Sequence, residues 1–184
     1  MQVNFNPSIN QARPNFKAHF DNDSESKNII RHLSQNLSGQ VAILATHLAL
    51  TDIEGNDTIS LTQSLNDAKT DIYVLNSTNN KAINLGSSNS INADNILLTI
   101  FNKKLLNESP KQSVKYYLSK AMEMIAKNAM PELNQIKEME QQINVALANP
   151  TSLKNKLLEL NETLFFKRMD FIEKEIFSLA KKVK

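Results

Sequence analysis

Hydrophobic residues recur at helical spacing over much of the chain. Apolar positions repeat every three to four residues across 24–38, where Ser24 can cap a helix and Gly39 can end it. The range 41–50 is apolar nearly all round, which is typical of a buried central helix. The helical period returns across 92–107. These three ranges are therefore predicted to be helices.

The segment between these helices has a mixed pattern. Ser60 and Gln63 have the spacing of a capping box, which predicts a short helix, although Ile59 and Leu61 also alternate as in a strand. The ranges 72–75 and 82–85 are rich in residues that favour strands, and turn-forming residues separate them. One β-hairpin is predicted here.

The C-terminal part has the strongest helical pattern. It has no glycine after residue 86, and Ser109-Pro110 is typical of a helix start. Prolines interrupt the pattern at Pro131 and at Asn149-Pro150. A bend at Pro150 gives a long antiparallel helical hairpin. A second break at Pro131 gives a three-helix bundle instead.

These patterns predict a mainly α fold in three parts. Residues 1–23 form a flexible tail, because their prolines and polar spacers show no regular period. Residues 24–108 form a small α+β head of short helices with one β-hairpin near 71–86. Residues 109–184 form the helical hairpin or three-helix bundle.

Composition and charge exclude several classes of function. The chain has 41% hydrophobic and 22% charged residues, as ordinary folded proteins do, and its net charge is only +2. The basic residues of 167–184 alternate with acidic ones, so no nucleic-acid partner is expected. No apolar run is long enough for a bilayer, so no membrane partner is expected either. The absence of cysteine fits a cytoplasmic location.

Motifs for metal or catalytic chemistry are weak. The segment Asp52 to Gln63 resembles a calcium-binding EF-hand loop, but Asp57 replaces the glycine of the sharp turn and Gln63 replaces the bidentate glutamate. His19, His32 and His47 lack the spacing that puts two imidazoles on one helix face. With no nucleophile motif either, we expect no metal, no cofactor and no enzymatic activity.

The remaining candidates are apolar side chains that suit contacts with proteins. Methionine can line an adaptable binding surface, and phenylalanine in a tail can anchor it in a groove. The candidate interaction residues are Phe5, Phe16, Phe20, Met122, Met124, Met139 and Met169. The predicted function is a non-enzymatic helical interaction protein that binds a protein partner or forms a homo-oligomer through its C-terminal helices. The alternative is a ligand-binding or enzymatic site between head and hairpin.

Overall fold

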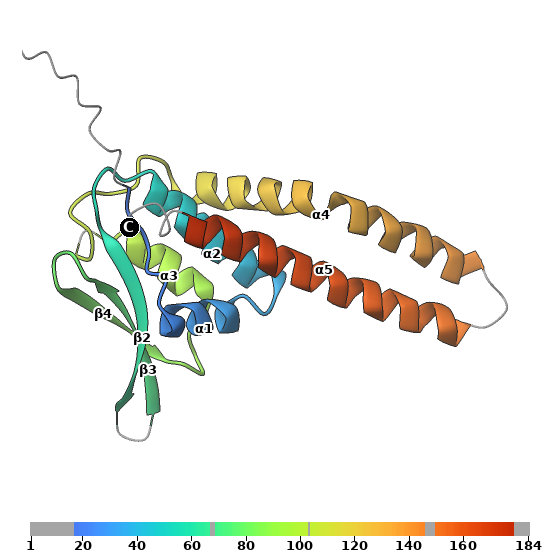
Figure 1. Cartoon of the computed structure of the whole chain (residues 1–184), viewed down its shortest axis with the longest axis horizontal. Coiled ribbons are helices and arrows are strands. Elements are labelled where there is room, and N and C mark those ends of the chain that lie inside the picture. Colours follow the sequence, from blue (N-terminus) through green and yellow to red (C-terminus); the bar gives the residue numbers. More distant parts are fainter. Residues whose placement is uncertain (1–16, 67–68, 103, 146–149, 179–184) are drawn as a thin grey trace, which may run out of the picture.

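The computed structural model describes residues 17–66, 69–102, 104–145 and 150–178. A four-stranded sheet lies at one end, three short helices pack beside it, and two long helices project from this head as an arm (Figure 1). The elements are β1 (His19–Phe20), α1 (Ser24–Leu33), α2 (Leu37–Thr51), β2 (Thr58–Asn66), β3 (Lys69–Asn76), β4 (Lys81–Ser87), α3 (Ala93–Ile100), α4 (Val114–Val145) and α5 (Pro150–Ser178).

The sheet makes this an α+β fold, so the predicted mainly α fold with a lone hairpin is wrong. The strand order is β1-β2-β3-β4, with β1 parallel to β2 and the other pairs antiparallel. The predicted hairpin corresponds to β3 and β4, but β2 lies against β3 as a third long strand. The error arose at β2, which local signals assigned to a helix.

The capping-box pattern at Ser60 misled the prediction because tertiary contacts override it. Ile59 and Leu61 are fully buried, and their Cα partners in β3 are Asn76 and Val74. The Ser60 hydroxyl donates to Asp21 at 3.0 Å and does not cap a helix. Alternating side chains that bury one face of a sheet gain more free energy than one local cap provides.

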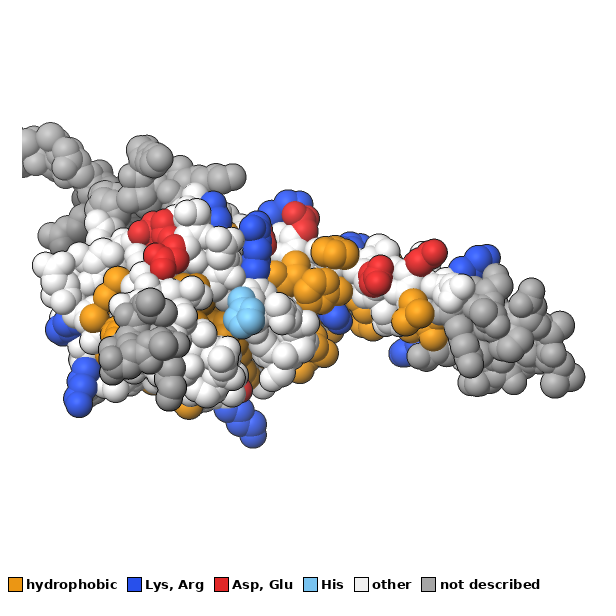
Figure 2. Space-filling model, turned by 90° about the horizontal axis from the view of Figure 1, so that it is seen from below, with side chains coloured by type: hydrophobic (Ala, Val, Ile, Leu, Met, Phe, Trp, Pro, Cys, Tyr) orange, Lys and Arg blue, Asp and Glu red, His pale blue; other side chains and the backbone are white. Residues whose placement is uncertain are grey.

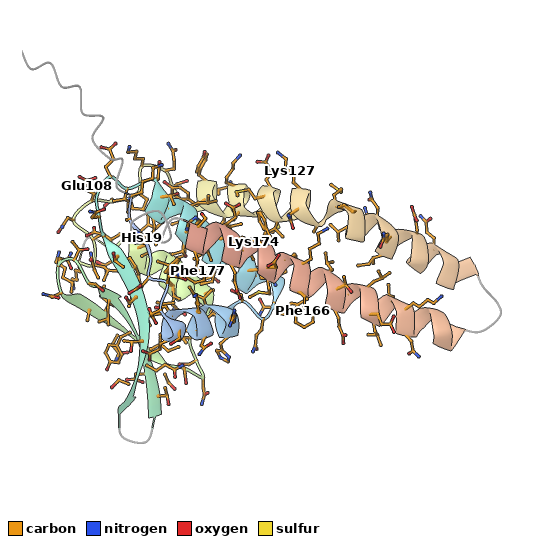
Figure 3. All side chains as sticks on the ribbon, in the orientation of Figure 1. His19, Glu108, Lys127, Phe166, Lys174 and Phe177 are labelled. Carbon is orange, nitrogen blue, oxygen red and sulfur yellow. The ribbon has the colours of Figure 1, made fainter. Side chains whose placement is uncertain are left out.

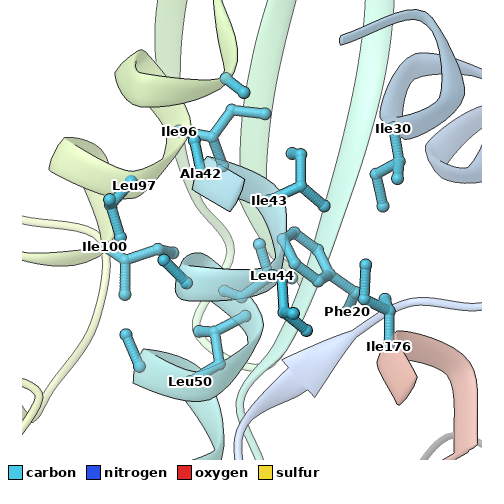
Figure 4. Packing of buried hydrophobic residues seen from close by; sticks show 14 of the residues in the cluster. Phe20, Ile30, Ala42, Ile43, Leu44, Leu50, Ile96, Leu97, Ile100 and Ile176 are labelled. Carbon is cyan, nitrogen blue, oxygen red and sulfur yellow. The ribbon is translucent and has the colours of Figure 1, made fainter. Parts of the chain in front are cut away.

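The end of the segment predicted as a tail belongs to the sheet. Ala18 and Phe20 are fully buried, and the Asp21 N–H donates to the Ile59 carbonyl at 2.8 Å. Phe20 points into the core beside Ile43 and Leu44 of α2 (Figure 4). The strand β1 is too short for a periodic pattern, so only its pairing with β2 defines it.

Helix α2 is the centre of the core, as its apolar sequence predicts. Eleven of its residues are buried, and it packs against α3, α4 and α5. Gly39 lies in its first turn, which Asn36 caps, so the prediction of a helix stop at Gly39 is wrong. A Cβ at Gly39 would lie 1.9 Å from the Leu33 carbonyl oxygen. Glycine is therefore required here by the close approach of α1 and α2.

The two C-terminal helices lie side by side and run in opposite directions (Figure 1). Helix α4 continues through Pro131, so the arm does not divide into a three-helix bundle. Pro150 is the first residue of α5, a position where proline costs no hydrogen bond. Away from the head, Ala129, Ile136 and Leu164 form a small second core between α4 and α5.

Candidate functional site

A groove of about 440 Å³ lies between α1 and α5, where the head meets the arm. We call it the α1–α5 groove. Hydrophobic side chains gather on this face at the junction of head and arm (Figure 2). The residues lining the groove are Asn28, Arg31, His32 and Gln35 from α1 and its end, and Phe165, Phe166, Met169 and Glu173 from α5.

The apolar wall of the groove is aromatic. Phe165 and Phe166 contact each other edge to face with ring centroids 5.4 Å apart. Phe165 is half-buried, whereas 67% of Phe166 is exposed on the side of α5 turned away from α4 (Figure 3). Met169 is buried below them. An exposed aromatic ring beside a groove is a common feature of protein-binding surfaces.

An ion pair bounds the groove and joins the two helices. Arg31 Nε and Nη2 donate to the two carboxylate oxygens of Glu173 at 2.5 and 2.8 Å. These bonds lower the pKa of Glu173 and raise that of Arg31. The Arg31 side chain is 53% exposed, so solvent screening limits the pair to about 0.2–1 kcal/mol of stability. The pair connects α1 to α5 across one end of the groove.

A second hollow lies beyond this ion pair. It measures about 510 Å³ and is bounded by the start of α1 and the end of α5, with Glu173 shared between the two hollows. Its charged groups already have partners. Lys174 Nζ lies 2.6 Å from Asp170, and Lys27 Nζ lies 5.3 Å from the centre of the Phe177 ring. This hollow therefore extends the groove without adding an unpaired charge of its own.

The apolar wall continues outward along α5. Leu158, Phe165 and Met169 are seven and four residues apart, so they share one helix face, and Phe166 adjoins it. We call these four residues the α5 face. Leu158 is 63% exposed although it is a large aliphatic side chain. The α5 face thus runs from the groove toward the far end of the arm.

Helix α4 carries a matching stripe. Met122 and Met130 are 48% and 50% exposed, and their spacing of eight residues puts them about two turns apart on the same side of the helix. We call these two residues the α4 face. Both long helices therefore present large apolar side chains to solvent in addition to those between them.

A third hollow, of about 260 Å³, lies where the end of α2 meets the start of α4. Here the Tyr117 hydroxyl donates to Asp52 at 2.5 Å. Burial and this bond raise the pKa of Tyr117 to about 12, so the hydroxyl stays protonated at neutral pH. Asp52 is also the C-cap residue of α2. The pair joins α2 to α4, and a tyrosine held in this form is a poor nucleophile or base.

The three histidines lie in different surroundings. His32 lines the α1–α5 groove, whereas His19 and His47 are buried. Burial, with a smaller contribution from His19, lowers the pKa of His47 to about 4. Its Nδ1 atom has no hydrogen-bond partner. Among the described residues, no three His, Asp or Glu side chains are grouped as a metal site requires.

The segment that resembles an EF-hand loop has a different structure. Asp52 accepts from Tyr117, Glu54 lies 2.8 Å from Lys111, and Asp57 is buried. The second half of the segment and the residues after it form β2, which begins at Thr58, whereas an EF-hand continues its loop to position 12 and then enters a helix. Two of the carboxylates of this loop, Asp52 and Glu54, are therefore bonded to residues near the start of α4.

The candidate interaction residues lie in different parts of the structure. Met169 lies in the groove and Met122 on the α4 face, but Phe20 is in the core and Met124 packs against that core. Phe20 and Met124 are therefore structural. Phe5, Phe16 and the side chain of Met139 lie outside the described residues.

The candidate interaction residues chosen from the sequence do not include Phe166 or Leu158, which are the two most exposed large hydrophobic residues in the described part of the chain. The signal was present, because two adjacent phenylalanines are 100° apart on a helix and cannot both face one partner helix. Before the Phe165-Phe166 pair, α5 packs against α4. From this pair onward, α5 also lies beside the head.

Comparison with known proteins finds no match to this chain. In the described part of the chain, no helix combines the length and the apolar character needed to cross a bilayer. No protein-family model, no curated protein and no solved structure matches the chain.

Proposed function

We propose that this protein is a non-enzymatic interaction protein that self-associates through its C-terminal helices. The observation that carries the proposal is the α5 face, on which Leu158 and Phe166 are 63% and 67% exposed. Burying a leucine or phenylalanine side chain contributes roughly 1.5–3 kcal/mol, so two such side chains left exposed on one helix favour association. The partner surface extends from the arm into the α1–α5 groove.

A second copy of the chain fits this surface. From Val114 to Ser178 the arm has nine basic and nine acidic side chains, so two arms meet without net repulsion. Two helical hairpins related by a two-fold axis form a four-helix bundle, in which each copy covers the exposed stripes of the other. The α4 and α5 faces provide such stripes on both helices.

The hollows between head and arm give less support to the alternative of a catalytic or ligand-binding site. Their ionisable groups are largely bonded to one another, as in the pairs Arg31–Glu173 and Tyr117–Asp52. Groups paired in this way stabilise the contact of head and arm and are not free to act on a substrate. A cytoplasmic location is part of the same proposal.

Charged substitutions on the α5 face test the proposal. The double variant Leu158→Lys, Phe166→Lys should raise the dissociation constant of the self-associated form at least tenfold, measured by light scattering over a dilution series. Each lysine would place a charge in an apolar interface. Both side chains are exposed in the single chain, so the circular dichroism spectrum and melting of the isolated chain should change little.

The matched control is Leu98→Lys on α3. Leu98 is 58% exposed, so it has nearly the same exposure but lies on the head. We expect this variant to associate as the unaltered chain does. Equal association of all three proteins, or loss of association only in Leu98→Lys, would contradict a role for the α5 face.

A further inference from the structure

The two edges of the sheet differ in whether other parts of the chain bond to their backbone groups. Beside β2, the strand β1 pairs only at Thr58 and Ile59. Beyond them the Leu61 N–H donates to the Ser26 hydroxyl at 2.9 Å, and the Gln63 N–H donates to the Glu25 carboxylate at 2.7 Å. Side chains at the start of α1 thus accept hydrogen bonds from N–H groups of β2 that would otherwise be free to pair with another strand.

The opposite edge, formed by β4, has no such cover. Among the described residues, β4 pairs with β3 alone, and no backbone bond to any other segment involves residues 82–85. This stretch, Ala-Ile-Asn-Leu, contains neither a charge nor a proline, the residues that usually protect an edge. Figure 1 shows β4 at the side of the head, away from the arm.

The stretch 82–85 is bounded by a bulge at one end and by a lysine at the other. At one end a register shift leaves Leu85 without a Cα partner in β3, and Gly86 follows with φ of 102°. Such a bulge ends regular pairing. At the other end, the Lys81 ammonium group has one long contact within the described residues, at 3.4 Å from the Asn107 side chain. The edge therefore offers one short, regular stretch that begins beside an ammonium group.

The side chains beneath this edge are incompletely covered. Ile83 and Leu85 pack against the main core but are only half-buried, in contrast to Ile72 and Val74 of β3, which are fully buried. A strand added beside β4 would cover them with its own side chains on the same face of the sheet. The edge thus combines unpaired backbone groups with apolar surface.

We propose that the β4 edge binds an extended segment of a partner protein as a fifth strand. The segment alternates apolar side chains on the core face with polar ones on the other face. It carries a carboxylate beside Lys81. This contact is separate from the α5 face, so the protein would bind its partner segment whether one copy or two are present.

The test uses a defined peptide and nuclear magnetic resonance. The probe is a seven-residue peptide of alternating valine and threonine with one terminal glutamate, blocked at both ends. It should produce saturable shifts at alternate amides of residues 81–85, because only every second N–H of β4 points to the free edge. The control peptide, with its central valine replaced by proline, should produce none.

A variant of the protein tests the charge. Lys81→Glu should weaken binding of the glutamate peptide about fivefold, because like charges on neighbouring strands repel. Two results of the titration would overturn the proposal: no shifts in β4 at millimolar peptide, or shifts along the α1–α5 groove instead. A third contrary result would be slow exchange of the alternate β4 amide hydrogens with solvent in the free protein. The last would mean that the chain itself, or a second copy, already covers the edge.

Discussion

Replacing Phe20 by alanine is expected to lower the free energy of unfolding by about 3–5 kcal/mol. Phe20 is fully buried in the middle of the core, although it lies in the segment whose sequence predicts a flexible tail. The substitution leaves a cavity between β1 and α2, which the surrounding helices can fill only in part. Urea denaturation at one low protein concentration measures the loss without a contribution from association.

Phe166→Ala is the control for this experiment. It removes the same atoms from a position that is 67% exposed, so its effect on the unfolding of the single chain should stay within about 0.5 kcal/mol. A small effect of Phe20→Ala, comparable to that of Phe166→Ala, would mean that residues 17–23 do not pack as described.

The second large effect is on the pH dependence of stability and comes from His47. The pKa of His47 is about 4 in the folded protein, because burial disfavours the charged ring, and about 6.5 in the unfolded chain. Above pH 6.5 neither state binds the proton, and stability is complete. As the pH falls from 6.5 to 4, the unfolded state gains a proton that the folded state does not, so about 3 kcal/mol is lost.

His47→Leu should remove this component of the acid destabilisation. The comparison is the difference in unfolding free energy between variant and unaltered protein at several pH values, since carboxylates affect both proteins alike. The difference should change by about 3 kcal/mol between pH 7 and pH 4. His32→Leu, at an exposed position, is the control for the loss of an imidazole. Parallel pH profiles for His47→Leu and the unaltered protein would show that His47 is not buried in its neutral form.

Elements that are determined by residues close together in the chain could be predicted from the sequence. Helix α2 has an apolar pattern that only burial explains, and α5 begins at Pro150 as its sequence predicts. The strands β3 and β4 are joined by a turn and contain their own signals. In each of these elements the determining residues are close together in the chain.

Elements that depend on distant residues were missed. The two residues of β1 form a strand only because β2 lies beside them, and β2 itself was mistaken for a helix at Ser60. Gly39 resembles a helix stop until the Leu33 carbonyl oxygen is seen next to it. No local pattern contains these contacts, so propensity alone assigned them wrongly.

The candidate surface was predicted only in part for the same reason. The choice of Met169 and Met122 followed from residue type, and both lie on or beside the exposed stripes. Whether Phe166 or Phe165 faces the partner helix depends on where α5 meets the head, and that is a property of the assembled fold. The β4 edge became visible only once the strand order was known.

The most direct test of the central proposal is the mass of the unaltered protein in solution. Sedimentation equilibrium at pH 7 over a hundredfold range of concentration should show the average mass rising from that of one chain toward that of two. Association through an arm without net charge should also persist at high salt, because it depends on apolar burial. A mass of one chain at every concentration and salt would contradict self-association through the C-terminal helices.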